Sequence, residues 1–160
     1  MTTFDGVVSL RSVTDANRVA VESLAVAPEQ RRFVSGVRES LLQAAGAPGA
    51  HALFWAIYAE ETPVGFVMIA DEVDSPDYIP QFLWKLLVDE RHQRRGIGTA
   101  TLDLIVEYFR KQGRTAMSTS AGLGAGSPVT FYERYGFQRT GDSHGDEVML
   151  RLEINSPQVT

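Results

Sequence analysis

The segment LVDERHQRRGIGTATL, residues 87–102, places two glycines between an apolar run and a strongly helical one. Glycine inside a helix or strand is destabilising by roughly 0.5–1 kcal/mol relative to alanine, so the pair marks a turn from strand to helix. The first turn of a helix has backbone N–H groups without partners, and the helix dipole favours negative charge there. Gly96 and Gly98 would let a ligand approach this backbone, and Arg94 and Arg95 would supply charge beside it. The segment predicts a phosphate-binding turn, and the alternative is a tight turn with solvated arginines.

The glycine spacing does not match the two common nucleotide-binding loops. The phosphate-loop pattern G-x-x-x-x-G-K-[ST] is absent, and QRRGIGT lacks the G-x-G-x-x-G spacing of a dinucleotide fold. A second glycine cluster, in residues 122–126, matches neither pattern, and we expect it to be a flexible loop. The sequence therefore does not predict a nucleotide-hydrolysing enzyme.

Composition places the chain among ordinary globular proteins. Its 160 residues, of which 44% are apolar and 22% charged, predict a single soluble domain spanning residues 1–160. No apolar run reaches the ~18 residues of a membrane span and the N-terminus lacks a secretion signal, so we expect a cytoplasmic protein. The net charge of −5 disfavours nucleic acid as a partner. The chain has no cysteine and its three histidines lack metal-ligand spacing, so no metal is expected.

Hydrophobic periodicity predicts strands and helices that alternate along the chain. Strands are expected at 7–12, in two runs of 51–73 joined by the turn 60–63, and at 81–88, 114–120 and 146–154. Helices are expected at 16–24, from Pro28 to a stop at 46–49, from the glycine pair to Gly113, and in 127–136. The apolar face of the second helix is expected to hold Phe33, Val34, Val37, Leu41 and Leu42. This order predicts an α/β (α+β) fold, a mixed sheet with helices on both faces.

The turn resembles the acetyl-CoA motif of the GNAT superfamily of N-acetyltransferases, [RQ]-x-x-G-x-[GA] directly after an apolar strand. Gln93, Gly96 and Gly98 fill its three defined positions. The segment SPVTFYERYGF, residues 127–137, resembles the next helix of that family, and the strand order agrees over nearly the whole chain. Within the superfamily, ERHQ and GSPVTFYERYGF are most similar to bacterial spermine/spermidine (diamine) acetyltransferases.

The resemblance implies a GNAT-like, mostly antiparallel sheet of six to seven strands, whose fourth and fifth strands splay apart around the pantetheine arm of acetyl-CoA. It implies main-chain contacts at Leu86 and Val88, with an N–H near Leu87 or Val88 polarising the thioester carbonyl. Other implied cofactor contacts are Gln93, Arg94, Arg95, Gly96, Ile97, Gly98, Thr99 and Ser127, the last also the expected helix cap.

The resemblance places a general acid, which protonates the departing thiolate, at Tyr132. A phenol, with a pKa near ~10, is a feasible donor to the thiolate of a thiol with a pKa near ~8.5. The alternative role for Tyr132 is aromatic packing. With no cysteine in the chain, we expect direct transfer in a ternary complex.

The resemblance implies that the acetyl acceptor is a primary amine of a small molecule, with polyamines such as spermidine and spermine as candidates. The general base is unassigned. Candidates for a base or an acceptor contact are Glu29, Asp71, Glu72 and Trp84, with Asp74 and Asp77 on the same acidic segment as Glu72. The chain departs from some polyamine acetyltransferases at Ala125, where they carry asparagine, and at Trp84, where they carry an acidic residue.

Two alternative functions stay open at this point. One is a sensor that binds acyl-CoA without turnover, and the other is acetylation of a protein N-terminus or lysine. A homodimer is a further prediction, by analogy alone.

Overall fold

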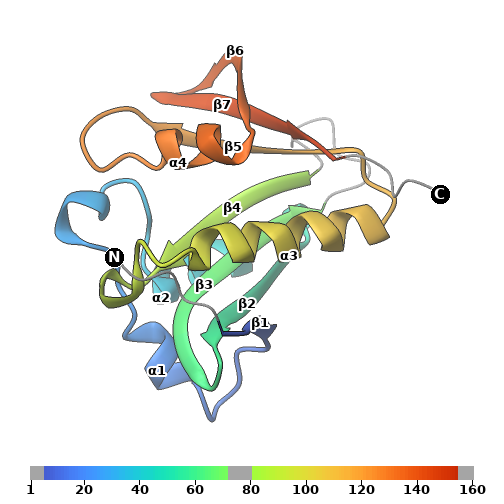
Figure 1. The fold of residues 1–160 in the computed structure, drawn as a ribbon. Coiled ribbons are helices and arrows are strands. Elements are labelled where there is room, and N and C mark those ends of the chain that lie inside the picture. Colours follow the sequence, from blue (N-terminus) through green and yellow to red (C-terminus); the bar gives the residue numbers. More distant parts are fainter. Residues whose placement is uncertain (1–5, 72–80, 155–160) are drawn as a thin grey trace.

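The computed structural model describes residues 6–71 and 81–154, which form one seven-stranded sheet with helices on both faces (Figure 1). The strands are β1 (Val8–Arg11), β2 (Ala52–Ala59), β3 (Thr62–Asp71), β4 (Gln81–Val88), β5 (Ala116–Gly122), β6 (Gln138–His144) and β7 (Glu147–Glu153). Their order is β1-β2-β3-β4-β5-β7-β6, and only β4 and β5 pair in parallel. This mixed, mostly antiparallel sheet confirms the predicted fold class.

Four α-helices and three short 3₁₀ turns connect the strands. The helices are α1 (Arg18–Glu22), α2 (Val37–Ala45), α3 (Ile97–Lys111) and α4 (Val129–Tyr135), and the turns are η1 (Pro28–Gln30), η2 (Pro48–Ala50) and η3 (Glu90–His92). None of the described helices is long and apolar enough to cross a membrane.

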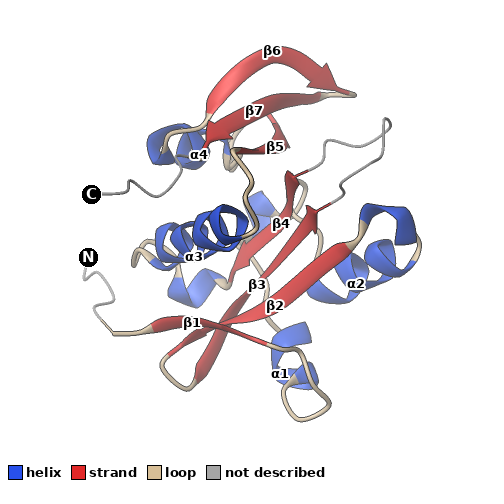
Figure 2. Ribbon diagram, turned by 90° about the vertical axis from the view of Figure 1, so that its right-hand side faces the viewer, coloured by secondary structure: helices blue, strands red, loops and turns tan. Residues whose placement is uncertain are grey.

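Each face of the sheet has its own apolar cluster. α3 and α4 cover one face with side chains such as Leu102 and Phe109, and α1 and α2 cover the other with Val21 and Val37. Figure 2 shows the two pairs of helices on opposite sides of the sheet. Because strand side chains alternate between faces, β3 and β4 contribute to both clusters.

A β-bulge changes this alternation in β4. Met68 of β3 lies opposite Lys85, and Ile69 lies opposite Leu83, so Trp84 has no direct partner across the ladder. Leu83 belongs to the α3 cluster, whereas Trp84 packs against the α1–α2 cluster. Lys85 shares the face of its partner Met68, so two consecutive side chains point toward α1 and α2.

β4 and β5 diverge soon after they meet. Their one paired position among the described residues is Phe82 opposite Ser118. One residue further along, the hydroxyl of Thr119 donates to the carbonyl oxygen of Leu83 at 3.0 Å, so a side chain joins the strands where the ladder has ended. Figure 1 shows the two strands separated beyond this point. The predicted splay of the fourth and fifth strands is therefore confirmed.

The helix predicted from Pro28 was wrong in its first half. Residues 28–30 form a 3₁₀ turn and the α-helix begins at Val37, after an extended Gly36. Phe33 lies outside the helix because its ring packs over Gly122, where a Cβ would come within 3.3 Å of it. Leu42, predicted on the apolar face, is 66% exposed.

Two further segments differ from the prediction. β6 was not predicted as a separate strand, because all seven of its residues are exposed and carry no apolar alternation. The glycine cluster was expected to be a flexible loop, yet it packs closely against residues 29–33. A Cβ at Gly126 would lie 2.4 Å from the carbonyl oxygen of Glu29, and one at Gly124 would lie 2.6 Å from Arg32.

Candidate active site

A cavity of about 490 Å³ lies where the end of β4, the start of α3 and α4 meet. Its size falls within the range of small-molecule sites. Its walls come from five stretches of the chain: the η1 region, β4, the turn before α3, the glycine cluster and α4. The fold therefore brings the predicted cofactor turn and Tyr132 into one site.

The N-terminus of α3 is open to this cavity. Gly96 precedes the helix with a φ of +82°, a left-handed conformation that favours glycine, and Arg94 also has a positive φ of 62°. No side chain caps the helix, and its first turn holds no acidic residue. The first backbone N–H groups and the helix dipole are thus available to an anion.

The second glycine of the motif has a packing role. A Cβ at Gly98 would lie 3.1 Å from the ring of Phe131, so glycine lets α4 approach α3 closely. The predicted role of Gly98, making room for a phosphate, stays a prediction beside this packing role. The close approach of the two helices brings Phe131 and Tyr132 to the cavity.

Side-chain amides hold the turn against the end of β4. Gln93 donates to the carbonyl oxygen of Val88 and to the side-chain oxygen of Gln30, both at 2.8 Å. Gln30 in turn accepts from the backbone N–H of Ala27 at 3.0 Å. Gln93, a motif residue, therefore joins the turn, β4 and η1 and also lines the cavity.

Asp89 stabilises the same junction between the end of β4 and the turn before α3. It is 3% exposed and accepts hydrogen bonds from the backbone N–H of Ala25 at 3.0 Å and from the backbone and side chain of Arg91 at 3.1 and 2.8 Å. Burial alone would raise the pKa of Asp89, but these hydrogen bonds outweigh it and hold the pKa below its usual value.

The edge of β4 that faces away from β3 presents backbone groups to the gap, although the carbonyl oxygen of Val88 already accepts from Gln93. The N–H of Asp89 donates to Val64 of β3 at 2.8 Å, which defines a hydrogen-bonded pair in the antiparallel ladder. Because such pairs alternate, Leu87 also faces β3, whereas the backbone groups of Leu86 and Val88 face the gap toward β5. These are the two positions at which the family resemblance implies main-chain contacts with the cofactor.

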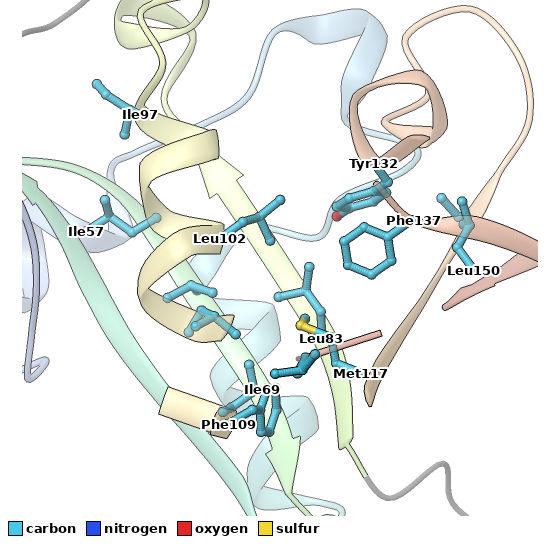
Figure 3. Packing of buried hydrophobic residues seen from close by; sticks show 14 of the residues in the cluster. Ile57, Ile69, Leu83, Ile97, Leu102, Phe109, Met117, Tyr132, Phe137 and Leu150 are labelled. Atoms are coloured by element: carbon cyan, nitrogen blue, oxygen red, sulfur yellow. The ribbon is translucent and has the colours of Figure 1, made fainter. Parts of the chain in front are cut away.

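Tyr132 is 6% exposed, and its phenol interacts with Thr119, whose own hydroxyl donates to Leu83 at the point where β4 and β5 diverge. Figure 3 shows the ring beside Phe137, with the hydroxyl oxygen directed across the core toward Leu102. Burial raises the pKa of Tyr132 to about 12, although the hydrogen bond with Thr119 opposes the shift. Tyr132 also packs against Phe131 and Phe137, at ring-centroid distances of 5.5 and 5.4 Å. It is thus both a core aromatic and a neutral phenol at the cavity.

Most of the predicted cofactor residues line the cavity: Leu86, Val88, Gln93, Arg94, Gly96, Ile97, Gly98, Thr99 and Ser127. Leu87 and Arg95 do not. The Leu87 side chain is buried on the α1–α2 face, and the Arg95 guanidinium lies 3.4 Å from the His92 ring. Ser127 accepts from the N–H of Val129 at 3.2 Å and so supports the start of α4, but the N-cap position is held by Pro128 and not by Ser127 as predicted.

Of the predicted base and acceptor residues, those that the structure describes do not line the cavity. Asp71 ends β3 and accepts from Arg114 and Gln81, both at 3.1 Å, roughly 16 Å along β4 from Leu86. Glu29 is exposed on η1, and its backbone and Cγ pack near Gly126. Trp84 packs against the α1–α2 cluster. Glu72, Asp74 and Asp77 lie outside the described residues.

Sequence reasoning did not find several residues that line the cavity. Arg134 reaches it from α4 and adds a second cation to that of Arg94, and Gln30 and Val34 reach it from the region around η1. A basic residue two positions after Tyr132 was a signal for Arg134. Nothing in the local sequence indicated Gln30 or Val34, because they approach through the tertiary fold. Among the described residues, no group of three His, Cys, Asp or Glu side chains could hold a metal ion.

Residues 50–139, more than half of the chain, match the family described as "Acetyltransferase (GNAT) domain". The chain belongs to the GNAT acetyltransferase family. The matched span runs from β2 to the start of β6, so it holds the open helix N-terminus, the diverging strands and Tyr132. The predicted family is thereby confirmed.

This GNAT chain is 34% identical to human N-acetyltransferase 8 over 92 residues, which are 56% of this chain and 40% of that protein. It spans less than half the length of the N-acetyltransferase 8 proteins that it matches. It is 25% identical to the spermine/spermidine N(1)-acetyltransferase of Bacillus subtilis over 150 residues, 90% of this chain and 97% of that protein. Among solved structures, the PaiA N-acetyltransferase of Thermoplasma acidophilum in complex with coenzyme A has a TM-score of 0.63 at 16% identity, covering 92% of this chain and 99% of that one.

Proposed function

We propose that this protein transfers an acetyl group from acetyl-CoA directly to a primary amine of a small molecule. The observation that carries this proposal is one cavity in which the N-terminus of α3, the edge of β4 that faces the gap and the neutral phenol of Tyr132 meet. A diphosphate, a thioester and a thiolate leaving group need these three features, in that order along the cofactor.

The residues around the turn fit the phosphate end of acetyl-CoA. The first N–H groups of α3 would receive the diphosphate, and Arg94 and Arg134 would add charge. One helix end stabilises an anion by only about 0.3–2 kcal/mol, so several N–H groups and both arginines are needed together. The backbone edge at Leu86 and Val88 would pair with the amide groups of the pantetheine arm.

Acetyl-CoA supplies the activated acetyl group, and the chain orients it and stabilises charge. An N–H at the free edge of β4, such as that of Val88, would donate to the thioester oxygen as negative charge develops there. Such a preset donor can contribute roughly 3–4 kcal/mol to transition-state stabilisation. Tyr132 would donate its phenolic proton toward the sulfur as the carbon–sulfur bond breaks. The acceptor nitrogen forms the new bond to the acetyl carbon and releases a proton to solvent or to a base.

The raised pKa of Tyr132 keeps the phenol protonated over the pH range of the reaction, although it also makes the phenol a weaker acid than the thiol of coenzyme A. An aliphatic amine attacks in its neutral form, which becomes abundant as the pH approaches ~10.4. A phenol with its pKa at about 12 stays protonated over that whole range, so acid and nucleophile are both in their reactive forms.

Polyamines such as spermidine and spermine are the first acceptors to test, because a spermine/spermidine acetyltransferase matches nearly the full chain. None of the described candidate bases reaches the cavity, so the general base stays unassigned. Homodimer formation and a cytoplasmic location also stay predictions.

The test is a thiol-release assay with acetyl-CoA and a panel of polyamines, amino acids, aminoglycosides and peptides, run beside calorimetry with coenzyme A. We expect coenzyme A to bind and thiol release to depend on the added amine. Binding without thiol release on any acceptor would indicate an acyl-CoA sensor. Absence of binding would overturn the whole assignment.

A further inference from the structure

Lys85 is a partly buried lysine on β4, at the point where β4 and β5 diverge. It is one of only two lysines in the chain, the other being Lys111, beside thirteen arginines. The β4 bulge turns its side chain toward α1 and α2, three residues beyond the last β4–β5 pair at Phe82. It therefore lies at the opening gap between the strands, on the face opposite α3.

The environment of this ammonium group is poorly matched to a charge. Lys85 is half-buried, and its Nζ donates to the hydroxyl oxygen of Ser35 at 3.2 Å. Within the described part of the chain, no carboxylate comes within ion-pair distance of it. Burial lowers the pKa of Lys85, and Glu147 and Glu39 oppose this only from longer range. A partly desolvated cation thus has a neutral hydroxyl as its hydrogen-bond partner.

A segment of the chain crosses the gap directly beside Lys85. On the β5 side, Arg32 donates to the carbonyl oxygen of Ala125 at 3.1 Å. On the β4 side, Ser35 accepts from Lys85. Between them, Val34 lines the cavity, as does Leu86, the residue after Lys85. Lys85 and Ser35 therefore lie just behind the cavity wall, at the end away from the phosphate turn.

The Ser35 hydroxyl is also positioned to donate a hydrogen bond to an anion. Its oxygen accepts from Lys85 and, at 3.5 Å, from Gln43, which leaves its own hydroxyl hydrogen as a donor. The lysine has two further N–H donors. One ammonium and one hydroxyl can together bind a single carboxylate. Glu39 and Glu147, at longer range, add negative charge, so the surroundings suit a ligand that carries both a carboxylate and an ammonium group.

We infer that Lys85, with Ser35, binds the carboxylate of an amino-acid-like acceptor and so presents its free amine to the gap between β4 and β5. This inference rests on the proposed acetyl transfer and narrows its acceptor class. A polyamine would instead place an ammonium group beside the Lys85 cation, which is repulsive in a partly buried site. Lys85 is thus a specificity-determining residue, distinct from the cofactor contacts.

The test compares acceptors that differ only in the carboxylate. The pairs are L-ornithine and putrescine, L-lysine and cadaverine, L-leucine and isoamylamine, and L-phenylalanine and phenethylamine. We expect kcat/KM to be about ten- to hundredfold higher for the amino acid of each reactive pair. Lys85→Gln should remove that preference by raising KM for the amino acid, while the KM for acetyl-CoA stays unchanged. Lys85→Arg should keep part of the preference, and Lys111→Gln, at the exposed end of α3, is the matched control.

The outcomes separate this inference from the transfer proposal. Equal or better turnover of the amines that lack a carboxylate overturns the inference alone. So does a Lys85→Gln variant that lowers kcat/KM equally for both members of each pair, because that indicates a structural role. Absence of thiol release with every acceptor, including polyamines and peptides, overturns acetyl transfer and this inference with it.

Discussion

Replacing Tyr132 with phenylalanine tests the proposed general acid with little disturbance of the fold. The change removes one hydroxyl group and keeps the ring that packs between Phe131 and Phe137. The polar interaction with Thr119 is lost, and an interaction of this kind contributes at most about 1 kcal/mol to the free energy of unfolding. We therefore expect a folded variant with a slightly lower Tm at neutral pH.

The effect on turnover should be much larger. A positioned general acid contributes roughly 10²–10⁴-fold to the rate of the step that it assists. Because the pKa of Tyr132 is about 12, the phenol is protonated between pH 7 and 10. Removing the phenolic hydroxyl should therefore lower kcat by at least about 100-fold over that range. The dissociation constant of coenzyme A should stay within about threefold, since the phosphate contacts lie at the other end of the cavity.

The same substitution should also change how the free energy of unfolding depends on pH in the alkaline range. The pKa of Tyr132 is raised in the folded state to about 12, against ~10 in the unfolded chain. The folded state therefore keeps its proton while the unfolded state loses it, and this contribution to stability is present below pH 10 and lost as the pH rises from 10 to 12. A shift of two units corresponds to about 2.7 kcal/mol. The free energy of unfolding of the phenylalanine variant should therefore fall less between pH 10 and 12 than that of the unchanged protein.

The assay is amine-dependent thiol release, with calorimetry for coenzyme A and urea unfolding at several pH values. The matched control is Tyr135→Phe, which removes a phenol from the same helix that donates to Asp103 at 2.7 Å outside the cavity lining. The control should lose stability without losing turnover. If the Tyr132 variant retains kcat within about threefold of the unchanged protein, the general-acid role is refuted.

Three other predictions concern the site and its support. Arg134→Gln should weaken coenzyme A binding about tenfold in calorimetry, with a smaller salt dependence, because one cation at the cavity is lost. Asp89→Asn should lower the free energy of unfolding at pH 7. Because the folded pKa of Asp89 is lowered, its contribution is present above pH ~4 and fades as the pH falls, so the difference between the two proteins in urea unfolding should shrink in acid. Gly126→Ala should destabilise by at least about 2 kcal/mol in urea, because φ is +86° and the new Cβ would meet the Glu29 carbonyl oxygen.

Two of these predictions have a control within the chain, and the third is tested by its pH dependence. Arg151→Gln removes an exposed arginine of β7, and equal loss of binding in both arginine variants would contradict the role given to Arg134. Gly113 also has a positive φ but open space around it, so equal destabilisation by alanine there and at Gly126 would show that the clash is unimportant. A difference between Asp89→Asn and the unchanged protein that stays constant down to pH 2 would contradict the lowered pKa.

The elements that the sequence predicted well are those with strong periodicity. β4 and α3 carry long apolar patterns that a single sheet or helix can satisfy, and the glycine pair marks the turn between them. β6 was not found because an exposed edge strand needs no apolar alternation. The false start at Pro28 arose because Phe33 and Val34 fit a helical period, while in the structure they turn toward Gly122 and the cavity.

The candidate site likewise has one part that the local sequence could predict and one part that it could not. The proposed cofactor end is local in sequence, because a strand, a turn and a helix start follow one another, so the motif could name its residues. The proposed acceptor end is assembled from segments far apart in the chain. Ser35 meets Lys85 across fifty residues, and Arg32 meets Ala125 across ninety-three. No local pattern encodes such contacts, and the acidic residues proposed instead, such as Asp71, are used in an ion pair elsewhere.

The bulge in β4 explains how one strand can serve both substrates. Without it, side chains would alternate strictly, and Lys85 would point into the α3 core with Leu83. With it, Lys85 joins the opposite face, while the backbone of Leu86 and Val88 still faces the gap. The cofactor can then be held by main-chain groups that need no particular side chain, and selection of the acceptor falls to a side chain on the other face. Substitutions at Lys85 should therefore change which amine reacts while leaving coenzyme A binding intact, whereas a substitution that removes the bulge should impair both.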